Sequence, residues 1–328
     1  MSLTLMLVAL ACASAAPQAR AGSFDWRSRG ILFRIVADVP VDAGPGSAAA
    51  TSTAIGVDAI PSPPPPMTTA TQVQPEPSFL FATIHYGSTE QQGLFLAGLR
   101  ERLEASRMLV NELSGAEQWR PEYEAYRSLG QGQRLSTLLG TRAFAQLQAQ
   151  LPAYTADTLD GLKPWVAMSM LEMPDEPEHD GIDLQLEDWA REGGLRVLHL
   201  ENLPEQLAAL DCVPAAEYAA VLGQRLRAGW SFEEEAARTL GHYRQRDLPA
   251  WYDEIERMPG LEGAAIAVEQ RARHCLIEAR NARWLPVLER LLREGDCFVA
   301  VGAIHLTGDH GLLAQLSRRG FTVTVEPW

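Results

Sequence analysis

The chain has 328 residues with a formal net charge of −14, and it contains 46% hydrophobic and 21% charged residues, a composition typical of a globular protein. This length suits one large domain or two small ones. The sequence has no cluster of Lys and Arg, which excludes a nucleic-acid partner, and its acidic balance suits a protein that handles a peptide or small-molecule substrate.

The first residues form an apolar run that is too short to span a bilayer and is followed by small residues. This pattern predicts a signal peptide over residues 1–22, although the usual positively charged start is missing. We therefore expect a periplasmic or secreted protein with no transmembrane span in the mature chain. A lipid anchor at Cys12 is the less favoured alternative, because Ala9 stands where the lipidation motif prefers a larger aliphatic residue.

Residues 30–36 and 78–84 are strand-like, and the segment between them is rich in Pro, Ala, Ser and Thr. This insert, at about residues 41–78, has too few large apolar side chains to offset the entropy of ordering, so we expect it to be disordered. We interpret it as a loop between two strands of one domain, residues 23–328.

Further along the chain, short apolar runs alternate with longer amphipathic stretches. Strand-like runs lie at 79–84, 107–111, 195–200, 297–304 and 321–325. Helical periodicity covers 90–104, 131–150, 183–192, 204–210, 214–228, 231–239, 263–293 and 310–319. This order predicts an α/β fold with a central mixed, partly parallel sheet flanked by helices. The helical blocks at 115–175 and 214–260 are expected to cover the sheet.

Three cysteines remain after the signal, Cys212, Cys275 and Cys297. Their odd number and wide spacing indicate neither a disulfide framework nor a Cys-x-x-Cys metal pair. We interpret Cys275 and Cys297 as core residues, and one disulfide stays open as an alternative in an oxidising compartment.

Four of the predicted strands are each followed by an ionisable residue, namely His85, Glu112, Glu201 and His305. Ligands bind beyond the carboxyl ends of strands in open α/β sheets. Two imidazoles and one or two carboxylates at such an edge are a common ligand set for a divalent metal. The segments 82–85 and 302–305 are near copies, which strengthens the case for the two histidines.

Each of these residues also has an ordinary explanation. A single histidine after a strand is usually a hydrogen-bonded surface or core residue, and Glu112 could simply open a surface loop. Glu201 precedes Asn202, which is a suitable cap for a helix that starts there.

Arg280 lies on the apolar stripe of the helical segment 263–293. A buried guanidinium needs an anionic partner. That partner could be Glu112 or Glu201 in a structural ion pair, or a substrate carboxylate or oxyanion in a functional one. Asn281 beside it could add a neutral donor.

The sequence resembles the TraB/PrgY/GumN family, which is related to the Tiki proteins. The matching stretches are FLFATIH at 79–85, KPW at 163–165, GID at 181–183, HLEN at 199–202, RNxxW at 280–284, VAVGAIHL at 299–306, GxxGLL at 308–313 and RGFxV at 319–323. Together they span about residues 30–328, and the stretch at 299–306 is the most specific.

This resemblance implies a core shared with erythromycin esterases and a haem-binding lipoprotein group. Tiki proteins are described as metal-dependent proteases with two G-x-x-H motifs and a glutamate. Carried over, His85 and His305 would be metal ligands or catalytic histidines and Glu112 their partner, while Arg280 and Asn281 match the family's Arg-Asn pair. The first motif departs from the pattern because Ala82 replaces its glycine, which would strain the backbone if that glycine needs a positive φ.

We therefore expect an exported metal-dependent hydrolase, with a peptidase as the favoured class. A divalent ion (Mn, Co or Zn) would be bound by His85, His305 and Glu112, with Glu112 as ligand or general base. Arg280, Asn281 and Glu201 would orient substrate, and Arg280 and Asn281 would also stabilise developing charge. The alternatives are a non-catalytic protein that binds a peptide or haem, and a degenerate family member without activity.

Overall fold

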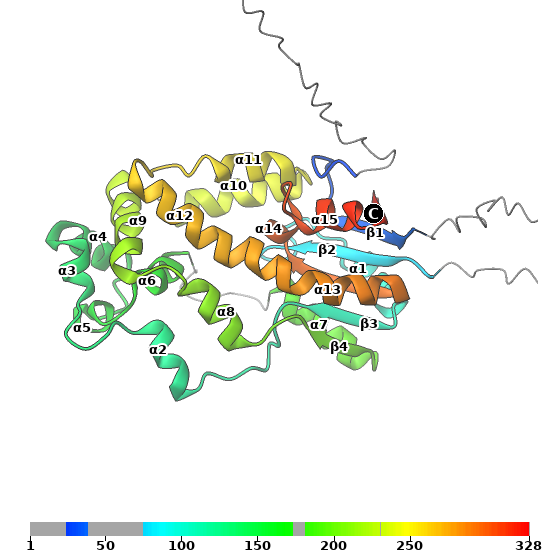
Figure 1. Ribbon diagram of the computed structural model, residues 1–328, viewed down its shortest axis with the longest axis horizontal. Helices are drawn as coiled ribbons and strands as arrows, with labels where there is room; N and C mark the ends of the chain where they lie inside the picture. The colour runs from blue at the N-terminus through cyan, green and yellow to red at the C-terminus, as the bar shows by residue number, and fades with distance from the viewer. Residues whose placement is uncertain (1–23, 39–74, 173–180, 230, 328) are drawn as a thin grey trace, which may run out of the picture.

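The computed structural model describes residues 24–38, 75–172, 181–229 and 231–327. The expected signal peptide and nearly all of the Pro-rich insert lie outside these residues. Within them, six strands form one sheet in the order β4-β3-β5-β2-β1-β6 (Figure 1). The strands are β1 (Leu32–Ala37), β2 (Ser78–Thr83), β3 (Met108–Asn111), β4 (Arg196–His199), β5 (Cys297–Gly302) and β6 (Phe321–Val325).

The sheet is mixed, which confirms the predicted fold class. Strands β2, β3, β4 and β5 pair in parallel, whereas β1 is antiparallel to both of its neighbours, β2 and β6. The central strand β5 is apolar and buried up to its last residue, Gly302, which is partly exposed, as expected for a parallel strand with helices on both faces. Residues Ala82 of β2 and Asn111 of β3 are in register with Val301 and Ala300 of β5, so the carboxyl ends of these strands meet at one edge.

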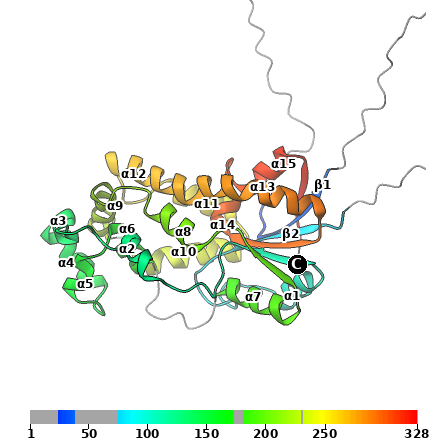
Figure 2. The ribbon, with the colours of Figure 1, turned by 60° about the horizontal axis from the view of Figure 1, so that its bottom comes forward.

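Helices lie on both faces of the sheet (Figure 2). One face carries α13 (Ala279–Glu294) and α15 (Leu312–Arg318), and the opposite face carries α1 (Leu96–Glu104) and α7 (Ile182–Glu192). Their buried leucines join the strand side chains in one core. No helix in the described ranges is long and apolar enough to cross a membrane.

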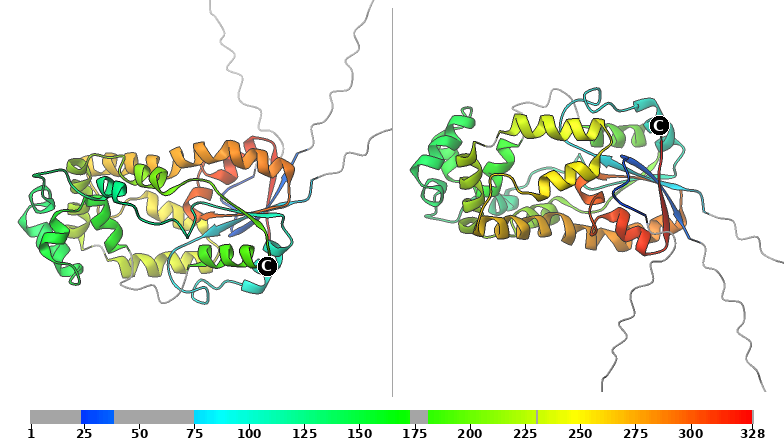
Figure 3. Two further views of the ribbon diagram at one scale, coloured as in Figure 1. Left: turned by 90° about the horizontal axis from the view of Figure 1, so that it is seen from below. Right: turned by 90° about the horizontal axis from the view of Figure 1, so that it is seen from above.

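The remaining helices lie mainly beyond the carboxyl edge of the parallel strands (Figure 3). They are η1 (Pro121–Tyr123), α2 (Glu124–Arg127), α3 (Leu135–Leu139), α4 (Thr141–Gln150), α5 (Ala156–Asp160), α6 (Pro164–Leu171), α8 (Leu203–Leu210), α9 (Ala215–Ala228), α10 (Phe232–Arg244), α11 (Leu248–Glu256), α12 (Ala264–Arg273) and α14 (Ala303–Leu306). We expected the block at 115–175 to cover the sheet, and this was wrong. Its apolar side chains pack with those of α9 and α12 into a second core, which is separate from the core at the sheet.

The predicted helix at 263–293 is interrupted by a π-helical turn. Between α12 and α13, residues His274–Glu278 form the π-helix η2, a feature often found at functional sites. Cys275 of η2 forms a disulfide with Cys212, which follows α8, with a Cα–Cα distance of 6.5 Å. The disulfide left open by the sequence is therefore present, and Cys297 is buried and unpaired.

Candidate active site

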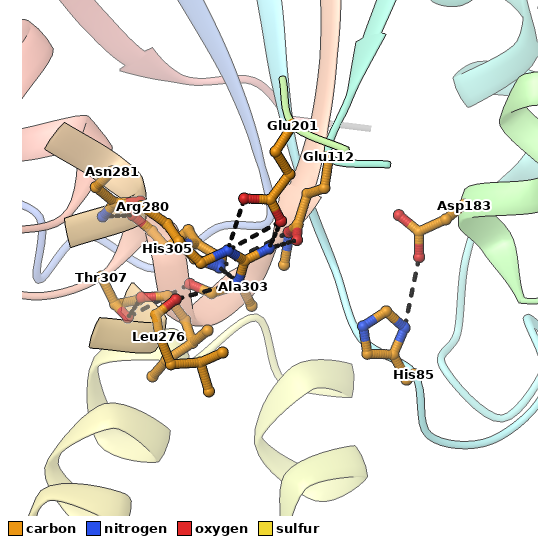
Figure 4. Close-up of polar contacts among 12 residues, drawn as sticks. His85, Glu112, Asp183, Glu201, Leu276, Arg280, Asn281, Ala303, His305 and Thr307 are labelled. Atoms are coloured by element: carbon orange, nitrogen blue, oxygen red, sulfur yellow. Dashed lines mark hydrogen bonds and ion pairs between the residues drawn. The ribbon is translucent and has the colours of Figure 1, made fainter. Parts of the chain in front are cut away.

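The four ionisable residues that follow the strands do not all lie together (Figure 4). Glu112 directly follows β3 and Glu201 lies just beyond β4, while His305 sits in the short α14 after β5. These three side chains surround Arg280 of α13, and His85 lies apart from them.

Arg280 binds both glutamates. The sequence offered Glu112 or Glu201 as its ion-pair partner, and in the structure both of them fill this role. Its Nε donates to the two carboxylate oxygens of Glu201 at 3.0 and 3.1 Å, and its Nη2 donates to Glu201 Oε1 at 2.6 Å and to Glu112 Oε2 at 2.7 Å. The side chains of Arg280 and Glu201 are only 4% and 1% exposed. Burial lowers the pKa of Arg280, but the two carboxylates raise it by more, which keeps the guanidinium charged.

The remaining N–H groups of Arg280 are also engaged inside the protein. Nη1 donates to the backbone oxygen of Leu276 in η2 at 3.1 Å and lies 3.0 Å from His305 Nε2. A guanidinium has five N–H groups, and these contacts use all of them. A substrate could therefore hydrogen-bond to Arg280 only by displacing one of its present partners, which favours an orienting role for this residue.

The hydrogen bonds of Asn281 define the tautomer of His305. The Asn281 Nδ2 group donates to the His305 backbone oxygen at 3.0 Å, so Asn281 Oδ1 is the atom that lies 2.8 Å from His305 Nδ1. Oδ1 can only accept, so Nδ1 carries the proton and Nε2 presents its lone pair. This assignment also lets Nε2 accept the N–H of Arg280.

His305 is held in its neutral form. Its side chain is 3% exposed, and burial lowers its pKa to about 4, with Arg280 adding to the decrease and Glu112 opposing it. The ring lies 4.5 Å from that of Trp284, and the Arg280 guanidinium lies 4.6 Å from the same indole. This packing leaves little freedom to the imidazole, so its orientation is set before any ligand arrives.

Glu112 is the most accessible member of the cluster, with a side chain that is 19% exposed. Its Oε1 accepts the backbone N–H of Gly302 at 2.7 Å and lies 3.9 Å from His305 Nε2. Burial raises the pKa of Glu112, but positive charge on His305 or Arg280 and the hydrogen bond from the Gly302 amide lower it by more. With His305 neutral, Arg280 and the Gly302 amide are the groups that favour the ionised carboxylate. Glu112 and His305 are thus both in the protonation states that a metal ion requires of its ligands.

His85 forms a separate pair with Asp183, at the start of α7. His85 Nδ1 lies 3.7 Å from Asp183 Oδ2, and the two side chains are 79% and 28% exposed. Asp183 Oδ2 is buried and accepts no hydrogen bond. Burial raises the pKa of Asp183, with Glu112 adding to the rise and His85 opposing it.

The loop that carries His85 is held by one buried side chain, Gln92. Its Nε2 lies within hydrogen-bonding distance of the backbone oxygens of Ile84, Tyr86 and Gly87, at 3.2, 2.9 and 3.1 Å. The backbone on both sides of His85 is therefore anchored, while the imidazole itself is mostly exposed.

Ala82, the residue that departs from the family motif, has no positive φ and lies buried in β2. Its backbone oxygen accepts a hydrogen bond from the Tyr243 hydroxyl at 2.6 Å. Backbone strain is thus not a consequence of the alanine. The equivalent Gly302 is more restricted, because a Cβ there would lie 3.3 Å from Glu112 Oε1.

The three expected metal ligands are not gathered at one point. Glu112 lies near His305 and His85 lies near Asp183, and among the residues that the structure describes no three His, Cys, Asp or Glu side chains are close enough to hold an ion. The donor chemistry does suit a divalent cation, with the unprotonated His305 Nε2, an ionised carboxylate and the Asp183 Oδ2 atom, which accepts no hydrogen bond. A three-ligand site would require the two pairs to approach each other.

Two residues at this edge were not among the predicted site residues, Asp183 and Gln92. Asp183 belongs to the GID stretch that resembles the family, and this match was the available signal. Gln92 had no signal, since a glutamine in a polar stretch is ordinary.

A family model matches residues 66–325 of the chain, and its description is TraB/PrgY/gumN family. Searches of curated proteins and of solved structures found no match.

Proposed function

The chain belongs to the TraB/PrgY/gumN family. From this premise we propose that it is a metal-dependent hydrolase, with a peptidase as the favoured class. The observation that carries the proposal is the protonation state of two neighbouring side chains. Glu112 is kept ionised, and His305 is kept neutral with Nε2 unprotonated. Burial alone would protonate a carboxylate, so Arg280 and the Gly302 amide maintain a charge that the interior disfavours.

In this proposal Glu112, His305 and His85 would hold a divalent cation, with Asp183 as a further oxygen donor. His305 Nε2 would bind the ion only after releasing the N–H of Arg280, which now occupies its lone pair. The bound ion would polarise a carbonyl group and lower the pKa of water. Glu112 suits the ligand role better than the role of general base, because a lowered pKa weakens a carboxylate as a base. Mn, Co and Zn all accept imidazole and carboxylate ligands.

The other residues orient these groups. Asn281 fixes the His305 tautomer, and Glu201 holds Arg280, which in turn holds Glu112. Residues that hydrogen-bond to metal-binding side chains in this way set the orientation and basicity of those side chains. Arg280 would contact substrate only after releasing one of its present partners.

We also propose that the protein acts outside the cytoplasm. The Cys212–Cys275 disulfide supports this, because such bonds persist mainly in oxidising compartments. The apolar N-terminal run supports it as well.

The test measures metal content and peptide cleavage on the same preparations of residues 23–328. The parent chain, Glu112→Gln and His305→Gln are compared with Glu217→Gln, a matched change at an exposed glutamate of α9. Each protein is loaded with Mn, Co or Zn, desalted, analysed for metal and incubated with a peptide library. We expect near-stoichiometric metal and cleavage in the parent and Glu217→Gln, and loss of both in the other two variants.

Equal metal content in all four proteins would contradict the metal site. Metal binding without cleavage of any library member would favour the alternative of a binding protein.

A further inference from the structure

The helix α8 connects the active-site cluster to the disulfide. It begins directly after Glu201 and Asn202 and ends before Cys212. Cys212 is bonded to Cys275 in η2, and Arg280 lies a short distance further along the same helical segment. The ion pair between Arg280 and Glu201 closes this path into a ring that contains α8, the disulfide, the helical segment from Cys275 to Arg280 and one salt bridge.

Both ends of α8 are held firmly. At its start, Asn202 and Glu205 form a reciprocal capping box, with hydrogen bonds of 3.0 and 2.9 Å. At its end, Asp211 accepts hydrogen bonds from Lys163 Nζ at 2.6 Å and Trp165 Nε1 at 3.2 Å. The KPW stretch at 163–165, which the cluster itself does not use, therefore anchors the end of α8 beside the disulfide.

The disulfide also lies next to a contact of the arginine. Leu276, adjacent to Cys275, provides the backbone oxygen that accepts a hydrogen bond from Arg280 Nη1. A π-helical turn is an uncommon insertion in an α-helix and needs surrounding contacts to persist. The bond to Cys212 is a covalent contact of this kind, placed one residue from the carbonyl that helps to hold Arg280.

We propose that Cys212 and Cys275 are positioning residues of the active site, whose disulfide fixes α8 and η2 so that Glu201 stays bound to Arg280. Opening the disulfide loosens this ion pair. The consequence for catalysis rests on the proposed function, whereas the coupling between disulfide and ion pair does not.

Reduction of the Cys212–Cys275 disulfide takes place at the protein surface. Cys212 is exposed and Cys275 is half-buried, whereas Arg280 and Glu201 are buried. A thiolate of a small dithiol such as dithiothreitol attacks one sulfur, the S–S bond breaks and a mixed disulfide forms. The second thiol of the reagent then closes its own disulfide, so the protein gains two thiols and the reagent is oxidised.

Thermodynamic linkage provides the test. If the disulfide favours the ion pair, the ion pair must favour the disulfide by the same factor. The equilibrium constant for reduction of Cys212–Cys275 by dithiothreitol is measured by thiol trapping and mass spectrometry in the parent chain, in Glu201→Gln and in Glu217→Gln. Glu217 is a matched control, because it pairs with Arg271 close to the disulfide but on the surface.

We expect Glu201→Gln to raise this constant by about threefold or more, the range of coupling between residues in one network, and Glu217→Gln to leave it unchanged. Equal constants in all three proteins would overturn the proposal.

A second measurement needs no variant, in case Glu201→Gln does not fold. Hydrogen–deuterium exchange is compared in the oxidised and the reduced parent chain. We expect reduction to accelerate exchange at the start of α8 and along η2, and to leave β6 unchanged. Faster exchange confined to η2 and the residues beside Cys212, with the start of α8 unchanged, would refute the coupling. Neither measurement uses activity or metal, so a chain without hydrolase activity could still satisfy both.

Discussion

The buried His305 predicts a specific loss of stability in mild acid. Its pKa is lowered to about 4 by burial, with a further contribution from Arg280, whereas an unfolded histidine titrates near 6.5. At pH values between these two pKa values, the histidine binds a proton in the unfolded chain and not in the folded chain. The stability that neutral His305 contributes is therefore present above about pH 6.5 and declines as the pH falls toward 4.

The magnitude follows from the two pKa values. At pH 5 the unfolded histidine is almost fully protonated while the folded one is still largely neutral, which costs about 2 kcal/mol relative to pH 7.5. The side chain is only 3% exposed, so solvent screening reduces this figure little.

The assay is urea unfolding at pH 7.5 and pH 5 in the presence of a chelator, so that no metal contributes. The parent chain is compared with His305→Gln and with His274→Gln, a histidine that pairs with Glu278 on the surface of η2. Comparing the change with pH, not the absolute stability, removes any cost of the substitution itself. We expect the change in His305→Gln to be about 2 kcal/mol smaller than in the parent, and His274→Gln to follow the parent. The same pH dependence in all three proteins would refute the reasoning.

Three further predictions concern neighbouring features. Arg280→Met leaves two facing carboxylates without their buried partner and should cost about 3–5 kcal/mol in urea unfolding; a loss below about 1 kcal/mol would contradict the buried network. Gly302→Ala should weaken metal binding by displacing the carboxylate of Glu112, whereas the matched Ala82→Gly should not, as metal titration would show. Burial, together with two neighbouring glutamates, raises the pKa of Glu172 to about 7, so its stabilising contribution is full below the unfolded pKa near 4.5 and is lost as the pH rises through 7. Glu172→Gln should therefore abolish a stability loss of about 2–3 kcal/mol between pH 5 and pH 8, and an unchanged pH profile would count against it.

The arrangement around Arg280 has a chemical consequence for this edge of the sheet. One buried guanidinium holds two carboxylates and one imidazole, so these three groups have defined positions without any ligand. His85 is exposed, and its ring lies 3.7 Å from Asp183 without a hydrogen bond to it. A cation or substrate that contacts both groups would therefore meet side chains held in place around Arg280 and a less restrained imidazole at His85.

Local patterns in the sequence were sufficient for the elements of the fold. Six apolar runs predicted the six described strands. Strands inside the sheet, such as β3 and β5, are nearly continuous apolar stretches because both faces are covered, whereas the edge strand β6 alternates buried and exposed residues. The cap at Asn202 and the need of Arg280 for an anion could likewise be predicted from neighbouring residues. Both features depend on short-range geometry or on the cost of burying a charge.

The choice of partners was decided only by the tertiary structure. Glu112 and Glu201 both bind Arg280, His85 lies by Asp183, and Cys212 pairs with Cys275. These contacts join residues that are 63 to 168 positions apart, so no local periodicity encodes them. The helices of residues 115–175 have the amphipathic pattern of sheet-covering helices, yet they pack on α9 and α12. An apolar face specifies that it must be buried, and the geometry of the whole chain determines which surface buries it.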